Sequence, residues 1–167
     1  MNLRTSRPVI LAATLAAALA ALQGCGSNPP AQASRAAAPA VYAGAEREAL
    51  LEIVRAQIGT PYRYGGSSPA TGFDCSGLVH YAHRHLGIAV PRTTADQWRA
   101  AATPGRPHLL PGDLLFFELG RDKARHVAIY EGGGRFIHAP SPGKRVSRAS
   151  LDNPFWQERL LGARTFL

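Results

Sequence analysis

The sequence predicts an α+β domain in which N-terminal helices pack on a central antiparallel β-sheet. Apolar residues recur at helical spacing up to about Trp98, whereas the later part holds short strand-like runs separated by glycine and proline. Seventeen glycines and thirteen prolines in 167 residues indicate many loops and argue against a helical bundle. Helices that precede strands in this way are typical of the α+β class.

The first 24 residues are predicted to be an export signal rather than a folded segment. Two arginines and no acidic residue precede an uncharged run at residues 9–22, which is rich in Ala and Leu. This run is too short to span a membrane comfortably and matches the core of a secretory signal. It ends in Leu22-Gln23-Gly24-Cys25, which resembles the lipoprotein box of bacteria.

Cys25 is the residue that this resemblance predicts to be lipidated. The box implies cleavage after Gly24, diacylglycerol on the Cys25 sulfur and acylation of the new amino terminus, and more than one acyl chain anchors a protein stably. By analogy with enteric lipoproteins, Gly26 favours the periplasmic side of the outer membrane as the location. Two alternatives remain open: an ordinary signal peptide with a chance cysteine, or a disulfide between Cys25 and Cys75.

Residues 25–44 are predicted to be a flexible tether, and residues 45–167 to be the domain. The tether has no large apolar residue before Val41, so it cannot bury enough surface to offset the entropy of ordering. The net charge of +8 favours an anionic partner without identifying it. The two cysteines are too few for a disulfide-stapled mini-protein or a cysteine-rich zinc fold.

Three helices are predicted in the first half of the domain. The first spans residues 45–58, where apolar residues form one stripe and a glycine and a proline follow. The second begins at Cys75, with Asp74 placed to cap it. The third is short, is capped by one of two threonines and runs through Trp98.

Four strands are predicted after the helices, at residues 113–119, 126–131, 135–139 and 160–166. The three glycines between the second and third strands permit a hairpin. With Gly133 at the centre of the turn, His138 lies opposite Ala128, and His126 is its diagonal neighbour on the same face, about 7–8 Å away. A register shifted by one residue would place the two histidines on opposite faces.

Cys75 has the position that an activated thiol needs. The positive end of a helix dipole stabilises a thiolate, and thiolate is the nucleophile of cysteine hydrolases. Such an enzyme also needs a base beside the sulfur and a group that orients the base, for which His126 and His138 are the candidates. Each residue also has a plain interpretation, as an inert core cysteine or as a satisfied polar residue in a strand.

Other candidate groups also have plain interpretations. His80, His83 and His85 are predicted to form a solvated helix face rather than a zinc site, because His85 points away from the other two and no carboxylate motif accompanies them. Tyr62 can equally be an aromatic residue of the core or the rim. Spacing alone therefore leaves the function open.

Motifs in a fixed order run through most of the domain. They read PYRYGG from residue 61, GFDCSGLV from 72, PRTT from 91, LPGDLLFF from 110, and the two histidine strands HVAIY from 126 and FIHA from 136. Together they resemble the NlpC family of bacterial cell-wall cysteine peptidases over nearly all of residues 46–166. The resemblance implies a papain-like NlpC-type fold.

The resemblance also implies a catalytic triad of Cys75, His126 and His138. By analogy, His126 is the base for the thiol and His138 orients His126. Tyr62 would help to hold the oxyanion, with the backbone N–H of Cys75 as the second donor. The residues expected to shape the substrate-binding end are Asp74, Ser76, Arg63 and Arg92.

The substrates implied by the resemblance are peptidoglycan stem peptides, hydrolysed at D-glutamyl–diaminopimelate or D-alanyl–diaminopimelate bonds through a Cys75 thioester. Their free carboxylates fit the basic charge of the domain, because a guanidinium group binds a carboxylate at two points. We expect a monomer that needs no metal or other cofactor, binds no nucleic acid and reaches the membrane through the lipid on Cys25. The alternatives are a non-catalytic wall-binding lipoprotein, and a transferase that passes the acyl group to an amine.

Overall fold

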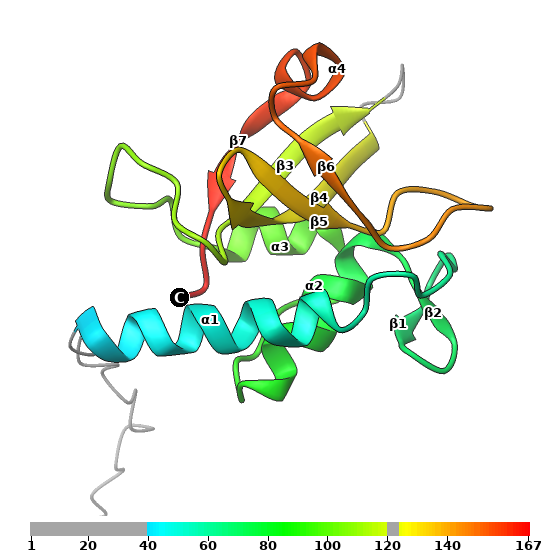
Figure 1. Ribbon diagram of the computed structural model, residues 1–167, viewed down its shortest axis with the longest axis horizontal. Coiled ribbons are helices and arrows are strands. Elements are labelled where there is room, and N and C mark those ends of the chain that lie inside the picture. The colour runs from blue at the N-terminus through cyan, green and yellow to red at the C-terminus, as the bar shows by residue number, and fades with distance from the viewer. Residues whose placement is uncertain (1–39, 120–123) are drawn as a thin grey trace, which may run out of the picture. The chain divides into compact units, whose positions relative to one another are not determined.

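The computed structural model describes residues 40–119 and 124–167, in which helices pack against a five-stranded antiparallel sheet (Figure 1). The helices are α1 (Ala40–Arg55), α2 (Cys75–His85), α3 (Thr94–Ala100) and α4 (Pro154–Gln157). The strands are β1 (Ser67–Ser68), β2 (Gly72–Phe73), β3 (Leu114–Leu119), β4 (Ala124–Gly132), β5 (Arg135–His138), β6 (Ser147–Ser150) and β7 (Leu160–Arg164). The predicted export signal, the lipidation of Cys25 and residues 25–39 of the predicted tether lie outside the described residues. Within the described ranges, none of the helices has both the length and the apolar character needed to cross a bilayer.

The sheet has the strand order β6-β5-β4-β3-β7, and every neighbouring pair is antiparallel. This arrangement confirms the predicted α+β class. Strands β4 and β5 pair Ile129 with Ile137 and Tyr130 with Phe136, which is the register predicted from the three-glycine turn. That register places His126 and His138 on the same face of the sheet, as expected.

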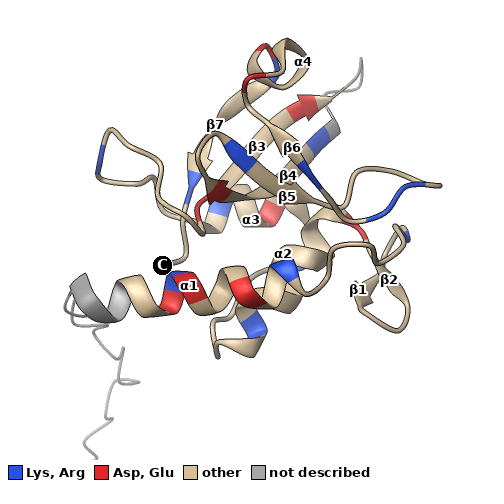
Figure 2. Ribbon diagram, in the orientation of Figure 1, with Lys and Arg blue, Asp and Glu red and all other residues tan. Residues whose placement is uncertain are grey.

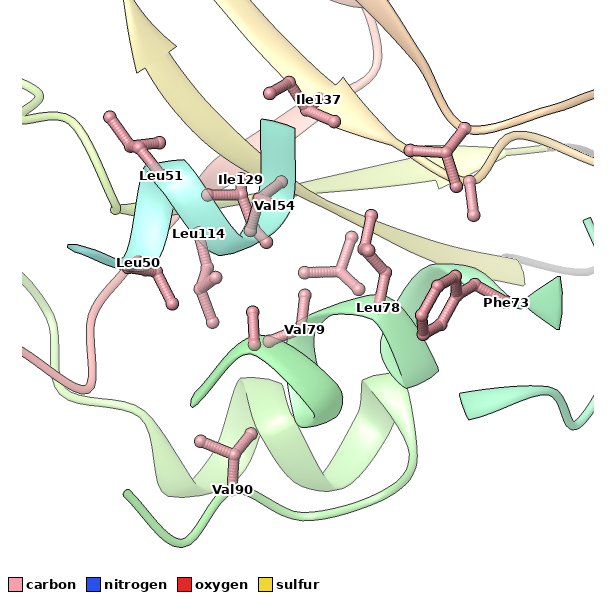
Figure 3. Packing of buried hydrophobic residues seen from close by; sticks show 14 of the residues in the cluster. Leu50, Leu51, Val54, Phe73, Leu78, Val79, Val90, Leu114, Ile129 and Ile137 are labelled. Carbon is pink, nitrogen blue, oxygen red and sulfur yellow. The ribbon is translucent and has the colours of Figure 1, made fainter. Parts of the chain in front are cut away.

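Both faces of the sheet are covered by apolar side chains. Leu114 and Phe116 of β3 belong to a large cluster that includes residues of α1 and α2 (Figure 3). Leu115 and Phe117, which alternate with them, belong to a second cluster on the other face, against which Trp156 packs. Successive residues of a strand point to opposite faces, so a strand covered on both sides is a continuous apolar run. The LLFF run of β3 is therefore explained by burial on both faces.

Helix α2 contributes buried residues to the larger cluster and begins at Cys75. Asp74 is the N-cap, and its side chain accepts a hydrogen bond from the backbone N–H of Gly77, which confirms the predicted cap. Thr93 caps α3 in the same way, through the N–H of Asp96. Both caps satisfy N–H groups that the first turn of a helix leaves without a partner.

The predicted solvated face of α2 is wrong for His83. Its side chain is 0% exposed, with Nδ1 2.9 Å from the carbonyl oxygen of Val79 and its ring packed edge-on against Phe166. Burial lowers the pKa of His83 to about 4, so the ring is neutral. The C-terminal segment of the chain covers this position, and helical periodicity within α2 does not reveal such a contact.

Two further boundaries differ from the sequence prediction. Helix α1 begins at Ala40, before the predicted domain start at residue 45, and ends at Arg55 rather than at residue 58. Strands β1, β2 and β6 and helix α4 were not expected. The first two of these strands form a small hairpin directly before Cys75, so they help to set the position of the nucleophile candidate.

Candidate active site

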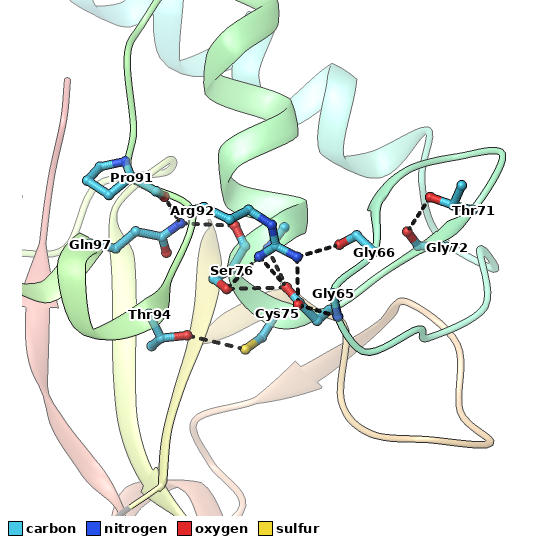
Figure 4. A network of polar contacts seen from close by, with 12 residues as sticks. Gly65, Gly66, Thr71, Gly72, Cys75, Ser76, Pro91, Arg92, Thr94 and Gln97 are labelled. Carbon is cyan, nitrogen blue, oxygen red and sulfur yellow. Dashed lines mark hydrogen bonds and ion pairs between the residues drawn. The ribbon is translucent and has the colours of Figure 1, made fainter.

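Cys75 is a half-buried free thiol at the first position of α2. Its Sγ lies 3.5 Å from the Oγ1 of Thr94, the first residue of α3 (Figure 4). Two helix starts therefore meet at the sulfur, and the hydroxyl of Thr94 can donate a hydrogen bond to it. The first turn of α2 and the hydroxyl of Thr94 therefore both lie beside this atom.

The carboxylate of Asp74 ties the loop before α2 to the helix. Its Oδ1 accepts hydrogen bonds from the N–H of Gly77 at 2.6 Å and from the hydroxyl of Ser76 at 3.2 Å. Its Oδ2 accepts one from the N–H of Gly65 at 2.9 Å. Burial by itself raises the pKa of Asp74, but the hydrogen bonds from Arg92 and these backbone groups outweigh it and lower the pKa. The group is therefore ionised at neutral pH.

Arg92 completes this network. Its Nη1 and Nη2 lie 2.9 Å and 2.7 Å from the two oxygens of Asp74, which is a two-point ion pair. The same nitrogens also donate to the hydroxyl of Ser76 at 3.0 Å and to the carbonyl of Gly66 at 3.1 Å (Figure 4). Both Nη groups of Arg92 bind protein oxygens, so Arg92 holds the loop in position. The predicted contact of Arg92 with substrate stays a prediction.

Two glycines allow the loop to lie directly on α2. A Cβ on Gly77 would be 2.0 Å from the carbonyl oxygen of Gly66, and a Cβ on Gly66 would be 2.3 Å from the carbonyl oxygen of Gly72. Both contacts are with backbone atoms, which cannot rotate away as a side chain can. Glycine is therefore required at both places for the loop to reach Asp74 and the helix start.

Gln97 fastens α3 to the same region. Its Nε2 donates to the carbonyl of Ser76 at 2.9 Å and to the carbonyl of Pro91 at 2.8 Å (Figure 4). The residue is fully buried, so these bonds form away from water and hold α3 rigidly beside α2. Thr94 is thereby held beside the sulfur.

His126 and His138 are in direct contact on β4 and β5. The Nε2 of His126 is 2.9 Å from the Nδ1 of His138, and the two rings are nearly perpendicular. Phe117, Phe136 and Trp156 surround the pair. Burial, and to a smaller extent the neighbouring His138, lowers the pKa of His126 to about 3. Burial also lowers the pKa of His138 to about 4. Both rings are therefore neutral at physiological pH.

Cys75 and His126 line one cavity of about 670 Å³, together with Tyr62. His138 does not line this cavity and lies behind His126. Burial raises the pKa of the Tyr62 hydroxyl, and the neighbouring Cys75 and Asp74 raise it further, so the hydroxyl keeps its proton and can donate it in a hydrogen bond. The structure thus brings together four residues that the sequence assigned to one site.

The predicted substrate-binding residues have different positions. Asp74, Ser76 and Arg92 line the cavity, but their polar groups bind one another. Arg63 is exposed and does not line it. The sequence reasoning gave no functional role to Arg125, which does line the cavity. The position of Arg125 directly before the candidate base His126 is the sequence signal that could have indicated a role for Arg125.

In the part of the chain that the structure describes, no three His, Cys, Asp or Glu side chains are grouped so that they could hold a metal ion. The cavity is lined by a thiol, a protonated phenol and the imidazole of His126, which contacts the second imidazole of His138. This set can perform nucleophilic acyl chemistry with the protein's own groups.

The chain is similar to several known proteins. The chain is 50% identical over 112 residues to the murein DD-endopeptidase MepH of Escherichia coli, which covers 65% of this chain and 41% of MepH. It is 40% identical over 147 residues to the probable endopeptidase NlpC of Escherichia coli, which covers 86% of this chain and 91% of that protein. A crystal structure described as similar to a lipoprotein of the NLP/P60 family, from Staphylococcus aureus, superposes with a TM-score of 0.65 at 35% identity, covering 74% of this chain and 42% of that one.

The chain spans only part of some curated relatives that it matches: 41% of MepH, and 50% of a further relative, the probable endopeptidase YafL of Escherichia coli. The sequence model of the NlpC/P60 family matches residues 59–165, a range that contains the thiol, both histidines and all of the large sheet. This match confirms the family that the ordered motifs predicted, and the chain belongs to the NlpC/P60 family of papain-like cysteine peptidases.

Proposed function

We propose that this protein is a lipid-anchored peptidoglycan endopeptidase that hydrolyses stem-peptide amide bonds through a thioester on Cys75. The observation that carries the proposal is the single cavity lined by a thiol at a helix start and by a neutral imidazole whose other nitrogen is held by a second histidine. The relatives named as murein or probable endopeptidases support the substrate class.

The hydrogen bond between the histidines determines which nitrogen acts as the base. The Nε2 of His126 is engaged with His138, so its Nδ1 is the nitrogen available to the thiol. For Nδ1 to accept a proton, Nε2 must carry the hydrogen and donate it to the Nδ1 of His138. His138 then carries its own proton on Nε2, and it stabilises the imidazolium that forms on His126.

The reaction that follows has two stages. The Sγ of Cys75 attacks the carbonyl carbon of the substrate amide while His126 takes the thiol proton. The oxyanion accepts hydrogen bonds from the backbone N–H of Cys75 and from the hydroxyl of Tyr62. His126 then gives its proton to the leaving amine, and the thioester remains. Water, deprotonated by His126, releases the acid and restores the thiol.

The proposal includes the cellular location. Lipid on Cys25 would place the domain on the periplasmic side of the outer membrane, and residues between Cys25 and α1 would give it reach towards the wall. The basic charge of the chain supports attraction to a polymer that carries free carboxylates.

A muropeptide digest tests the enzyme function. Purified peptidoglycan is incubated with the wild type, with Cys75→Ala and with Thr103→Ala, an exposed position outside the cavity, and the products are separated and weighed. We expect new peptide termini from the wild type and from Thr103→Ala, and none from Cys75→Ala. The same product profile from Cys75→Ala and wild type would overturn the proposal. The masses of the fragments also identify which bond is cut.

Thiol labelling separates this function from a non-catalytic wall-binding module. Iodoacetamide should label Cys75 stoichiometrically near neutral pH in the wild type, and labelling should slow strongly in His126→Ala, because no base then assists the thiol. Equal labelling rates in the two proteins would mean that the imidazole does not act on the sulfur.

A further inference from the structure

A second cavity, of about 450 Å³, adjoins the cavity that holds Cys75. It is lined by Thr94, Ala95, Glu118 and Arg125, and it shares Thr94 and Arg125 with the first cavity. Since the Oγ1 of Thr94 is 3.5 Å from the Sγ of Cys75, this second cavity begins beside the nucleophile. A substrate bound at the sulfur can therefore extend into it.

The second cavity carries one charge of each sign. Glu118 of β3 and Arg125 of β4 are direct register partners across the sheet, so their side chains leave the same face about 5 Å apart. Figure 2 shows an acidic position on β3 and a basic one on β4 near the same end of the sheet. Within the described part of the chain, the two side chains form no ion pair with each other or with another charged group. No charged group among the described residues therefore neutralises either side chain.

The guanidinium group of Arg125 lies over the aromatic ring of Trp98. Its guanidinium carbon lies 5.5 Å from the ring centroid of Trp98, and that ring packs edge-on against the buried Phe116. Arg164 also lies over this ring, with its guanidinium carbon 3.8 Å from the same centroid. A guanidinium held against a fixed ring keeps its N–H edges free for a carboxylate.

We propose that Glu118 and Arg125 form a subsite for a zwitterionic amino-acid group, with Glu118 binding the ammonium and Arg125 the carboxylate. This inference rests on the proposed function, because it assigns the subsite to a stem peptide bound at Cys75. A stem peptide contains one diamino acid. Where that residue is diaminopimelate and the peptide is not crosslinked, its side chain ends in a carbon that carries both an ammonium and a carboxylate group. A lysine side chain carries the ammonium alone.

Two substrates that differ only in the side-chain carboxylate test whether Arg125 binds that carboxylate. Two synthetic stem peptides, with diaminopimelate or lysine at the same position, are compared by kcat/KM in the wild type, in Arg125→Gln and in Arg135→Gln. Arg135 is an exposed arginine of β5 that does not line either cavity. We expect the wild type and Arg135→Gln to prefer the diaminopimelate peptide by about tenfold or more, and Arg125→Gln to bring the ratio close to one.

The same design tests whether Glu118 binds the ammonium group of the substrate side chain. Acetylation of the side-chain amine of diaminopimelate should lower kcat/KM in the wild type by a similar factor, and Glu118→Gln should remove this discrimination. Selectivity that is unchanged in Arg125→Gln and Glu118→Gln would overturn the subsite while leaving the endopeptidase function intact. If the wild type cleaves neither peptide and Cys75→Ala gives the same muropeptides as the wild type, the proposed function itself fails.

Discussion

Replacing Gly77 with alanine should disturb the helix start that carries the thiol. The new methyl group would lie 2.0 Å from the carbonyl oxygen of Gly66 and 3.0 Å from the Oδ1 of Asp74. Relief of the first contact requires a backbone shift of about 1 Å or more, because real contacts of this kind are about 3 Å or longer. The shift weakens the 2.6 Å hydrogen bond from the Gly77 N–H to Asp74.

These effects can be converted into a change in stability. Overpacking costs about 1–3 kcal/mol and a weakened charged hydrogen bond about 1–2 kcal/mol, against a gain of about 1 kcal/mol for alanine in a helix. The free energy of unfolding should fall by about 1–4 kcal/mol, which lowers Tm by roughly 2–16 °C in a chain of this size. Because the nucleophile moves with the helix start, kcat should fall by about a hundredfold.

Gly44→Ala is the matched control for this substitution. Gly44 also lies in a helix, α1, and a Cβ there would have nothing within 4 Å. Its Tm should stay the same or rise slightly, since alanine favours a helix by up to about 1 kcal/mol. Thermal unfolding and muropeptide kinetics are measured on both variants. A Gly77→Ala variant with the Tm and kcat of Gly44→Ala would refute the account of the packed loop.

Three further predictions concern the histidines and the sulfur. His138→Ala should lower kcat by about 10- to 100-fold, because His126 loses the acceptor of its Nε2 proton, and His138→Gln should restore part of the loss in a steady-state assay. Thr94→Val should slow iodoacetamide labelling of Cys75 several-fold without lowering Tm, since it removes the hydroxyl beside the sulfur. Burial depresses the pKa of His126 to about 3 and that of His83 to about 4 from 6.5. The unfolded chain therefore binds more protons below about pH 6.5, and urea midpoints should fall as the pH is lowered from there to about pH 4; midpoints that stay constant would contradict buried, neutral rings.

The sequence was sufficient for the parts of the site that depend on local signals. Asp74 before an apolar helical stripe predicts a cap, and three glycines between two strands predict the turn that sets the register of His126 and His138. Both features are decided by residues close together in the chain. The contact between the two imidazoles followed from that register alone.

The remaining features depend on residues that are distant in sequence. The pairing of Arg92 with Asp74 joins two segments through a folded loop, and single-residue patterns do not encode it. His83 occupies a helix position that looks polar in the sequence, yet Phe166 of the C-terminal segment after β7 packs against it. Strand β6 was missed because it is a short edge strand of small and polar residues, SRAS, without apolar alternation.

The central claim is that Cys75 forms an acyl-enzyme that water resolves. The most direct test is a muropeptide digest in heavy-oxygen water, with the products weighed by mass spectrometry. The account predicts one heavy oxygen atom in each newly formed carboxyl group with the wild type, and no such product with Cys75→Ala. Cleavage products without the heavy atom, or labelled products in equal amount from Cys75→Ala, would contradict it.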